Sequence, residues 1–213
     1  MTNRLGPVVT GVLVLFLMVS FMAYAKTPET IYIETEQPTI AIAEPIVPDV
    51  TIEIVKTLSE EELLWQKRYE EYPIATEVWL YMENVFGWEP QVCAGVMGNI
   101  MAEIGGGTLD FSDWHHEEGP YGICQWLGGR KKSIKEIYGE KVTVEEQLSF
   151  MYDELYGRNG VRQQVTDAQR EKILSAKTPQ KAARYFCIWF ERPNGGSGAR
   201  ERFAKIAYKY FVD

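Results

Sequence analysis

The chain has 213 residues, of which 46% are hydrophobic, 24% charged and 13% aromatic. This balance is typical of a globular protein with a core and excludes collagen-like, low-complexity and wholly disordered chains. The net charge of -8 argues against nucleic acid as the default partner, because phosphate binding needs a basic surface.

The N-terminal 25 residues are predicted to be an export or anchoring segment. Pro7 to Ala25 has no charged side chain and, as a helix, rises roughly 28 Å, close to the thickness of a bilayer's hydrocarbon core. Arg4 precedes it and an acidic stretch follows, which predicts a cytoplasmic N-terminus. Ala23-Tyr24-Ala25 is also a signal-peptidase pattern, so residues 1–25 are either a cleaved signal peptide or a retained membrane anchor.

Residues 26–58 are predicted to be an extracytoplasmic spacer rich in Pro, Thr and Glu. Prolines at 28, 38, 45 and 48 forbid a helix and limit strand pairing, while Ile and Thr favour an extended backbone. The globular domain is expected to follow over 59–213.

Helical signals dominate that domain. A capping box at Ser59 to Glu62 opens a helix that reaches about Glu71, Pro73 begins a second helix that Gly87 stops, and Pro90 precedes a third over 91–104. Tyr121 to Trp126 is predicted to be a short strand or hairpin arm. Further helices are expected at about 130–138, 143–156, 167–175, 179–190 and 199–211. The predicted fold class is mainly α, with one small β-hairpin beside the third helix.

The third helix contains the leading candidate for chemistry. Gly95 and Gly98 in its interior predict close packing of another element. Glu103 lies near its C-terminal end, on the face of Asn99 and Ile100, where the helix dipole and apolar neighbours favour a protonated carboxyl group. A protonated carboxyl group is what a general acid needs to cleave a glycosidic bond. A surface glutamate at a frayed helix end is the alternative.

Four motifs in unchanged order resemble the phage tail-tip lysozyme domain of the lysozyme-like superfamily. They read GVMGNIMAEIGG (95–106), YGICQW with Arg130 behind it (121–130), EEQLSFMYDEL (145–155) and WFERP (189–193). The resemblance covers roughly residues 72–211. It implies a lysozyme-like (α+β) fold and a peptidoglycan-cleaving activity with Glu103 as the catalytic acid.

The resemblance also suggests substrate-contacting residues and a second acid. Candidates for substrate binding are Asn99, Tyr121, Gly122, Gln125 and Trp126, although a tight turn explains Gly122 and core packing is the more frequent role of such a tryptophan. Asp110 and Asp113 are candidates for the second catalytic carboxylate, with loop capping beside Ser112 as the alternative. Glu191 of WFERP is interpreted as part of a structural ion pair.

Neither a metal nor a cofactor is expected. His115 and His116 belong to no known ligand frame. Three cysteines, at 93, 124 and 187, allow one disulfide and one free thiol in an exported domain, and those at 93 and 187 are most simply buried apolar residues.

These patterns predict an exported hydrolase that cuts the bond between N-acetylmuramic acid and N-acetylglucosamine, with peptidoglycan as its partner. Two alternatives stay open, namely a lytic transglycosylase that forms 1,6-anhydro ends and a non-catalytic wall-binding protein. A retained N-terminal helix would tether the enzyme to the outer face of the membrane, as expected of an enzyme that opens wall for a conjugation or secretion apparatus.

Overall fold

The computed structural model describes residues 58–112 and 118–213. By contacts, the chain divides into one unit over Met1–Gln66 and a second over Lys67–Asp213. The predicted N-terminal segment and nearly all of the predicted spacer lie outside the described residues. Among the residues that are described, no helix is long and apolar enough to cross a membrane.

The first described helix, α2 (Glu60–Glu71), begins with the predicted capping box. The Ser59 N–H donates to Oε2 of Glu62 at 2.8 Å, and the Glu62 N–H donates to Oγ of Ser59 at 3.2 Å. Two backbone donors that the helix itself cannot satisfy are therefore paired.

Proline begins each of the next two helices. Pro73 opens α3 (Pro73–Asn84) and Pro90 opens α4 (Pro90–Glu103). Proline suits the first turn because its fixed φ is already helical and its missing N–H would have no partner there. Between the two helices, Gly87 has a φ of +66°, which explains why the chain turns at a glycine.

The remaining helices follow the predicted order. They are α5 (Gly128–Tyr138), α6 (Val144–Tyr156), α7 (Asp167–Leu174), α8 (Pro179–Phe186) and α9 (Gly198–Phe211). The predicted capping box of Thr143 and Glu146 opens α6, and a second box that was not predicted, Thr166 with Gln169, opens α7.

The predicted helix over 179–190 is not regular throughout. After α8 the backbone widens into a π-helix, η1 (Cys187–Glu191), which the Arg192 N–H closes by donating to the Cys187 carbonyl at 2.7 Å. Arg192 then takes a left-handed φ of 52°. The hydrophobic pattern could not show this change, because it reports which face is buried and not the backbone hydrogen bonds.

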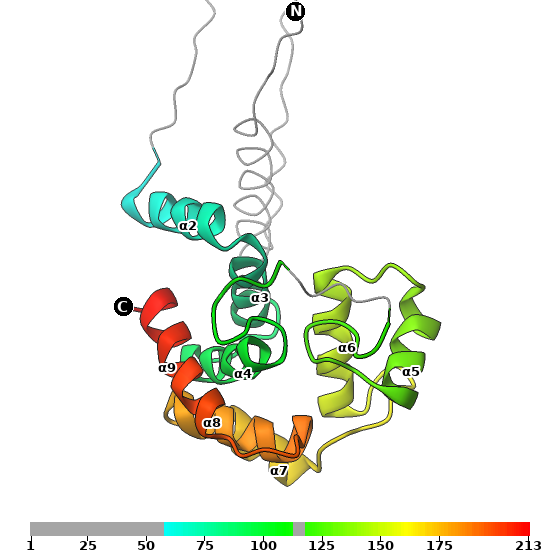
Figure 1. The fold of residues 1–213 in the computed structure, drawn as a ribbon. Helices are drawn as coiled ribbons and strands as arrows, with labels where there is room; N and C mark the ends of the chain where they lie inside the picture. Colours follow the sequence, from blue (N-terminus) through cyan, green and yellow to red (C-terminus); the bar gives the residue numbers. More distant parts are fainter. Residues whose placement is uncertain (1–57, 113–117) are drawn as a thin grey trace, which may run out of the picture. The chain divides into compact units, whose positions relative to one another are not determined.

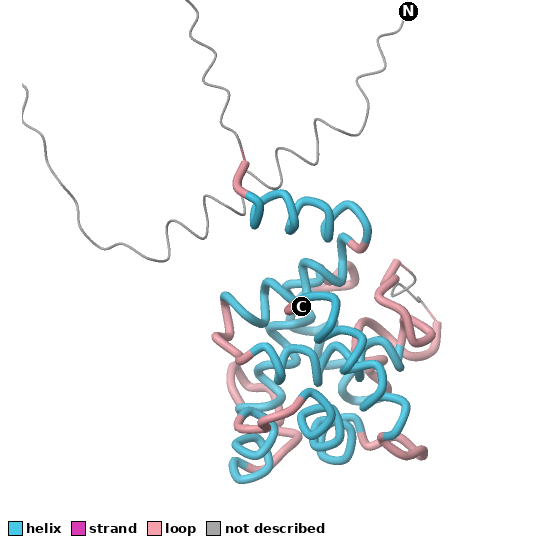
Figure 2. Tube along the Cα trace, turned by 90° about the vertical axis from the view of Figure 1, so that its left-hand side faces the viewer, coloured by secondary structure: helices cyan, strands magenta, loops and turns pink. Residues whose placement is uncertain are grey.

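The predicted β-hairpin is not found in the described part of the chain, which contains only helices and loops (Figure 2). At Tyr121 to Trp126 the structure has one antiparallel bridge between the two end residues, with N···O distances of 3.0 and 2.8 Å. The four residues between them form a turn. Six residues are enough to make this turn but leave no length for paired strands.

Within the second unit, α4 is the central element. Every residue of α4 from Val92 to Met101 is buried, and the helix packs against α3, α8 and α9. Figure 1 shows α8 and α9 gathered around α4, while α5 and α6 lie together on the other side of the unit. The mainly α fold class is confirmed.

Candidate active site

Two glycines bring α8 and α9 against α4. A Cβ atom added at Gly95 would lie 2.4 Å from Cβ of Ala182, and one added at Gly98 would lie 2.5 Å from the carbonyl oxygen of Arg200. No side chain fits at either place, so the backbones of the paired helices approach closely. This close packing offsets the cost of a glycine inside a helix, as the sequence predicted. This packing places the end of α4 beside α9.

Glu103 is the last residue of α4 and the first member of the candidate site. Its side chain is 20% exposed, and its Oε1 accepts a hydrogen bond from Nη2 of Arg200, whose side chain is 11% exposed. A guanidinium group in this position stabilises a carboxylate. The sequence pattern did not reveal this cation beside Glu103.

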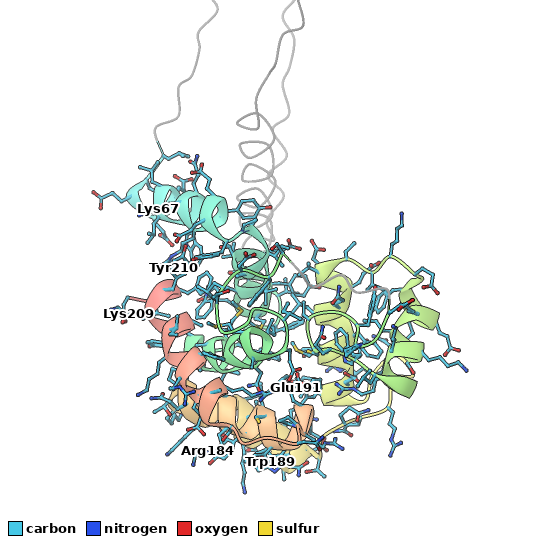
Figure 3. All side chains as sticks on the ribbon, in the orientation of Figure 1. Lys67, Arg184, Trp189, Glu191, Lys209 and Tyr210 are labelled. Atoms are coloured by element: carbon cyan, nitrogen blue, oxygen red, sulfur yellow. The ribbon has the colours of Figure 1, made fainter. Side chains whose placement is uncertain are left out.

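Glu191, at the end of η1, is a second carboxyl group in the same region. The residue as a whole is partly exposed, but its Oε1 is enclosed and has no hydrogen-bond partner among the described residues. Burial and the charge of Glu103 raise the pKa of Glu191 to about 8, and Arg130 opposes both effects. Figure 3 shows this side chain pointing into the middle of the domain, whereas Trp189 of the same helix lies at its edge. Among the described residues Glu191 forms no ion pair, so the sequence-based interpretation of Glu191 is not supported.

A third glutamate, Glu154 on α6, is fully paired. Its two oxygens accept hydrogen bonds from Nε and Nη2 of Arg130, at 2.6 and 2.7 Å, and Oε2 also accepts one from the Trp126 indole at 2.8 Å. Glu154 and Trp126 are almost completely buried. Trp126 thus fills the core and leaves no ring face for a sugar.

Three of the predicted substrate residues belong to the turn that Trp126 ends. The Tyr121 ring is buried and its hydroxyl group accepts from the Val142 N–H at 3.3 Å. A Cβ atom at Gly122 would lie 2.3 Å from Oε1 of Gln147, so this glycine is required by packing. Gln125 is partly exposed, has a φ of 47° and donates to the Gly122 carbonyl at 2.9 Å. Among these turn residues, Gln125 has the most accessible polar side chain.

The fifth predicted substrate residue, Asn99, joins two helices. Its Nδ2 donates to the carbonyl oxygens of Gly95 at 2.9 Å and Ala183 at 3.1 Å, and the residue is fully buried. The amide therefore links α4 to α8 and has no surface that a saccharide could reach.

Asp110 is exposed on the loop that follows α4. Its Oδ1 accepts from the Ser112 N–H at 3.0 Å, and hydrogen bonds from the Ser112 side chain and backbone lower the pKa of Asp110. It is therefore an ionised carboxylate in a loop turn. Asp113, His115 and His116 lie outside the described residues.

All three cysteines are free and buried, with no disulfide. Burial raises the pKa of the thiols of Cys93, Cys124 and Cys187. Protonated, enclosed thiols are poor nucleophiles, which gives no support to cysteine catalysis. Among the described residues, no group of three or more His, Cys, Asp or Glu side chains could hold a metal ion.

A pocket of about 330 Å³ opens beside the Arg130–Glu154 pair, and both residues line it. Leu127 and Gly129 of the turn and α5 line it, together with Val161 and Gln164 of the segment after α6. Glu103 and the other residues of α4 are not among its lining residues.

The sequence pattern thus singled out Glu103 as a candidate and missed the grouping of charged side chains around it. Three of these groups could have been suspected from the sequence, because the quoted motifs contain Arg130, Glu154 and Glu191. Arg200 gave no such clue, since it lies seven residues beyond the last motif. Their grouping depends on helix packing that a linear pattern does not contain.

The model of the family described as phage tail lysozyme matches residues 73–211. No curated protein and no solved structure matches the chain. The matched range begins at α3, ends with α9 and includes all the charged residues described above. The chain therefore belongs to the phage tail lysozyme family, which indicates a lysozyme-like, muramidase-type glycoside hydrolase acting on peptidoglycan.

Proposed function

We propose that this domain hydrolyses the glycosidic bond between N-acetylmuramic acid and N-acetylglucosamine, with Glu103 as the general acid. The observation that carries the proposal is the position of Glu103 at the open end of α4, partly exposed and held by Arg200. A carboxyl group fixed by a partner and still accessible can meet a glycosidic oxygen in a defined geometry. The family supplies the substrate class.

In this mechanism Glu103 donates a proton to the leaving oxygen as the bond to the anomeric carbon breaks. Positive charge develops on the sugar ring, and a carboxylate opposite the acid stabilises it or activates water. Asp110 is ionised and exposed, as that task requires. Asp113, three residues further along the loop, is retained as the other candidate. No cofactor takes part in these steps.

Among the five predicted substrate residues, we propose Gln125 as the one that contacts the glycan directly. It is the partly exposed member of the turn, and its amide offers both a donor and an acceptor to sugar hydroxyl or acetamido groups. Tyr121, Gly122, Trp126 and Asn99 support the site from within the core.

The proposed placement is extracytoplasmic, on the outer face of the membrane or released from it. An N-terminal helix that is retained would tether the enzyme through a spacer of about 30 residues, whose extended length is at most roughly 100 Å. Cutting would then be confined to wall near the membrane, as a conjugation or secretion apparatus requires. N-terminal sequencing of the native protein tests this, since a soluble species that begins at Lys26 contradicts the tether.

The catalytic assignment is tested with Glu103→Gln in the full-length chain. The amide keeps the shape and removes the acid, so release of soluble muropeptides from purified wall should fall at least 100-fold, within the range of general acid catalysis of roughly 10² to 10⁴. Glu136→Gln on the exposed face of α5 is the matched control and should keep full activity. Equal rates for Glu103→Gln and the unchanged chain contradict the assignment.

Mass spectrometry of the products separates the alternatives. Reducing muramic acid ends support hydrolysis, whereas 1,6-anhydro ends would make the enzyme a lytic transglycosylase, in which the sugar's own 6-hydroxyl group replaces water. Wall binding without either product would identify a non-catalytic binding protein.

A further inference from the structure

The pocket beside the Arg130–Glu154 pair has no part in the proposed catalytic steps. Three elements build it, namely the start of α5, the second half of α6 and the segment 161–164 that follows α6. Figure 1 shows α5 and α6 lying together. Pockets that bind small ligands have volumes of roughly 300 to 1,000 Å³, so a pocket of about 330 Å³ can hold a short part of a larger molecule.

One part of the pocket lining is apolar. Phe150 and Val161 belong to the core and are almost completely buried, whereas Leu127 is 59% exposed. Together they give the pocket an apolar surface that is partly open to solvent. Small methyl groups of a ligand would leave water on contact with this surface, which favours binding.

The charged part of the lining has an excess of positive charge. Two arginines, Arg130 and Arg162, line the pocket together with one glutamate, Glu154. Arg130 binds both oxygens of Glu154, so these two charges balance each other. Arg162 is exposed, and within the described part of the chain its guanidinium group forms no ion pair or hydrogen bond. Its five N–H donors are therefore available to an anion, and a carboxylate matches their planar geometry.

The start of α5 adds to the positive potential in the pocket. The N-cap residue, Leu127, provides no side-chain cap, and the first turn of α5 has no acidic residue. The positive end of the helix dipole is therefore not compensated within the helix. A Cβ atom added at Gly129, which lines the pocket, would meet nothing within 4 Å. The pocket is thus suited to a ligand that carries both a carboxylate and small apolar groups.

The pocket lies in the same region as the candidate active site. Arg192, the residue that follows Glu191, donates from Nη2 to the carbonyl oxygen of Gln164 in the pocket lining. The charges of Arg130 and Glu103 both act on the Glu191 carboxyl group. One substrate molecule can therefore reach the pocket and the end of α4 together.

We propose that this pocket binds the stem peptide of peptidoglycan, with Arg162 pairing with a carboxylate of the stem. This inference rests on the proposed function. The stem is joined to N-acetylmuramic acid, one of the two sugars at the bond that is cut, and unlike the sugar rings it carries both carboxylates and alanine methyl groups. Four extended residues span at most roughly 14 Å, which is enough to reach a neighbouring pocket from a sugar bound at Glu103.

Arg162→Gln in the full-length chain tests the proposal on two soluble substrates. The first is uncrosslinked glycan strands that keep their stems, and the second is the same strands after an amidase has removed the stems. The unchanged chain should have the lower KM for strands with stems. In the variant this KM should rise about 10-fold or more, because a charge-assisted hydrogen bond is lost, with kcat nearly unchanged. The KM for stripped strands should not change.

Arg202→Gln is the matched control. Arg202 is exposed on α9 and does not line the pocket, so its replacement removes the same charge and should leave both KM values unchanged. Calorimetric titration of each full-length protein with the free tetrapeptide stem gives a readout that needs no catalysis. The affinity should fall about 10-fold or more in Arg162→Gln and stay the same in Arg202→Gln.

The outcomes separate this proposal from the proposed function. If Arg162→Gln keeps both KM values of an active unchanged chain, the stem pocket is refuted while the proposed function stands. An equal rise of KM on both substrates also refutes the stem pocket, because the pocket would then bind the glycan strand. An unchanged chain that binds the tetrapeptide through Arg162 but releases no product refutes the proposed function alone.

Discussion

The Trp126 indole and the Glu154 carboxylate are joined by a 2.8 Å hydrogen bond in the core of the domain. Both side chains are enclosed, and the same carboxylate binds the guanidinium group of Arg130 through both oxygens. One glutamate on α6 therefore holds the end of the 121–126 turn and the start of α5 in place.

Glu154→Ala is expected to destabilise the domain strongly. It leaves a partly buried guanidinium group and a buried indole N–H without an acceptor, and breaking a fully buried ion pair costs about 3–5 kcal/mol, which is the upper limit here. Urea unfolding followed by tryptophan fluorescence measures the change. Glu136→Ala, in an exposed i,i+4 pair with Lys132, is the control and should change the free energy of unfolding by less than about 1 kcal/mol. Equal losses for the two variants would contradict the structural role of Glu154.

Gly95→Ala should also destabilise the domain, although alanine is the better helix former. The new methyl group would lie 2.4 Å from Cβ of Ala182 and 2.7 Å from the backbone nitrogen of Ala183. Overpacking of this kind costs about 1–3 kcal/mol, more than the roughly 1 kcal/mol gained by replacing a helical glycine. Gly129→Ala on α5 meets nothing within 4 Å and should be neutral or stabilising in thermal unfolding. A stabilised Gly95→Ala variant would mean that α4 and α8 do not pack this closely.

The stability of the domain should fall as the pH rises from about 5 to 8. Glu77 and Glu191 have pKa values of about 7 and 8 in the folded protein, against an ordinary value of 4.5. Between these values the folded state binds more protons than the unfolded state, so raising the pH favours unfolding. The stabilisation is fully present below about pH 4.5 and is lost through pH 7 and 8.

Thermal unfolding across this pH range provides the measurement. Glu77→Gln and Glu191→Gln should each reduce the slope of melting temperature against pH, and the double variant should reduce it further, because neither amide titrates. A slope that is the same in all four proteins would show that these two carboxyl groups are not the source of the pH dependence.

The three thiols should be unreactive in the native protein. Cys93, Cys124 and Cys187 are each no more than 2% exposed, and burial raises the pKa of each thiol, so thiolate is scarce near neutrality. A thiol reagent at pH 8 should label none of them before unfolding and all three in guanidinium chloride. Rapid labelling of one native thiol would show that its part of the core opens readily.

The sequence predicted the helices well because their limits depend on local chemistry. The capping box at Thr143 and the proline at position 90 act through backbone groups within one turn, and both were confirmed. The prediction of a strand at Tyr121 was wrong for a related reason. Its apolar residues fit either a strand or a buried turn, and the left-handed φ of Gln125 that decides between them leaves no clear pattern in the sequence.

The candidate site was less predictable than the fold. Position on a helix and the motif were enough to single out Glu103, but Arg200 approaches it from 97 residues away. The pKa of Glu191 depends on burial and on the charge of Glu103, which arise only when the chain is folded and α8 packs against α4. Protonation is a property of the packed side chains, so no local pattern at WFERP could have revealed it.

The π-helical turn makes the segment before Pro193 sensitive to changes in its length. An i to i+5 hydrogen bond from Arg192 to Cys187 accommodates one residue more than an α-helical turn would hold. Deleting one residue from 187–191 would let the turn close as regular α-helix, and the residues after the turn would nearly keep their register. The side chains within the turn would point in new directions, so such a deletion should displace Glu191 even where the deleted residue is the exposed Ile188.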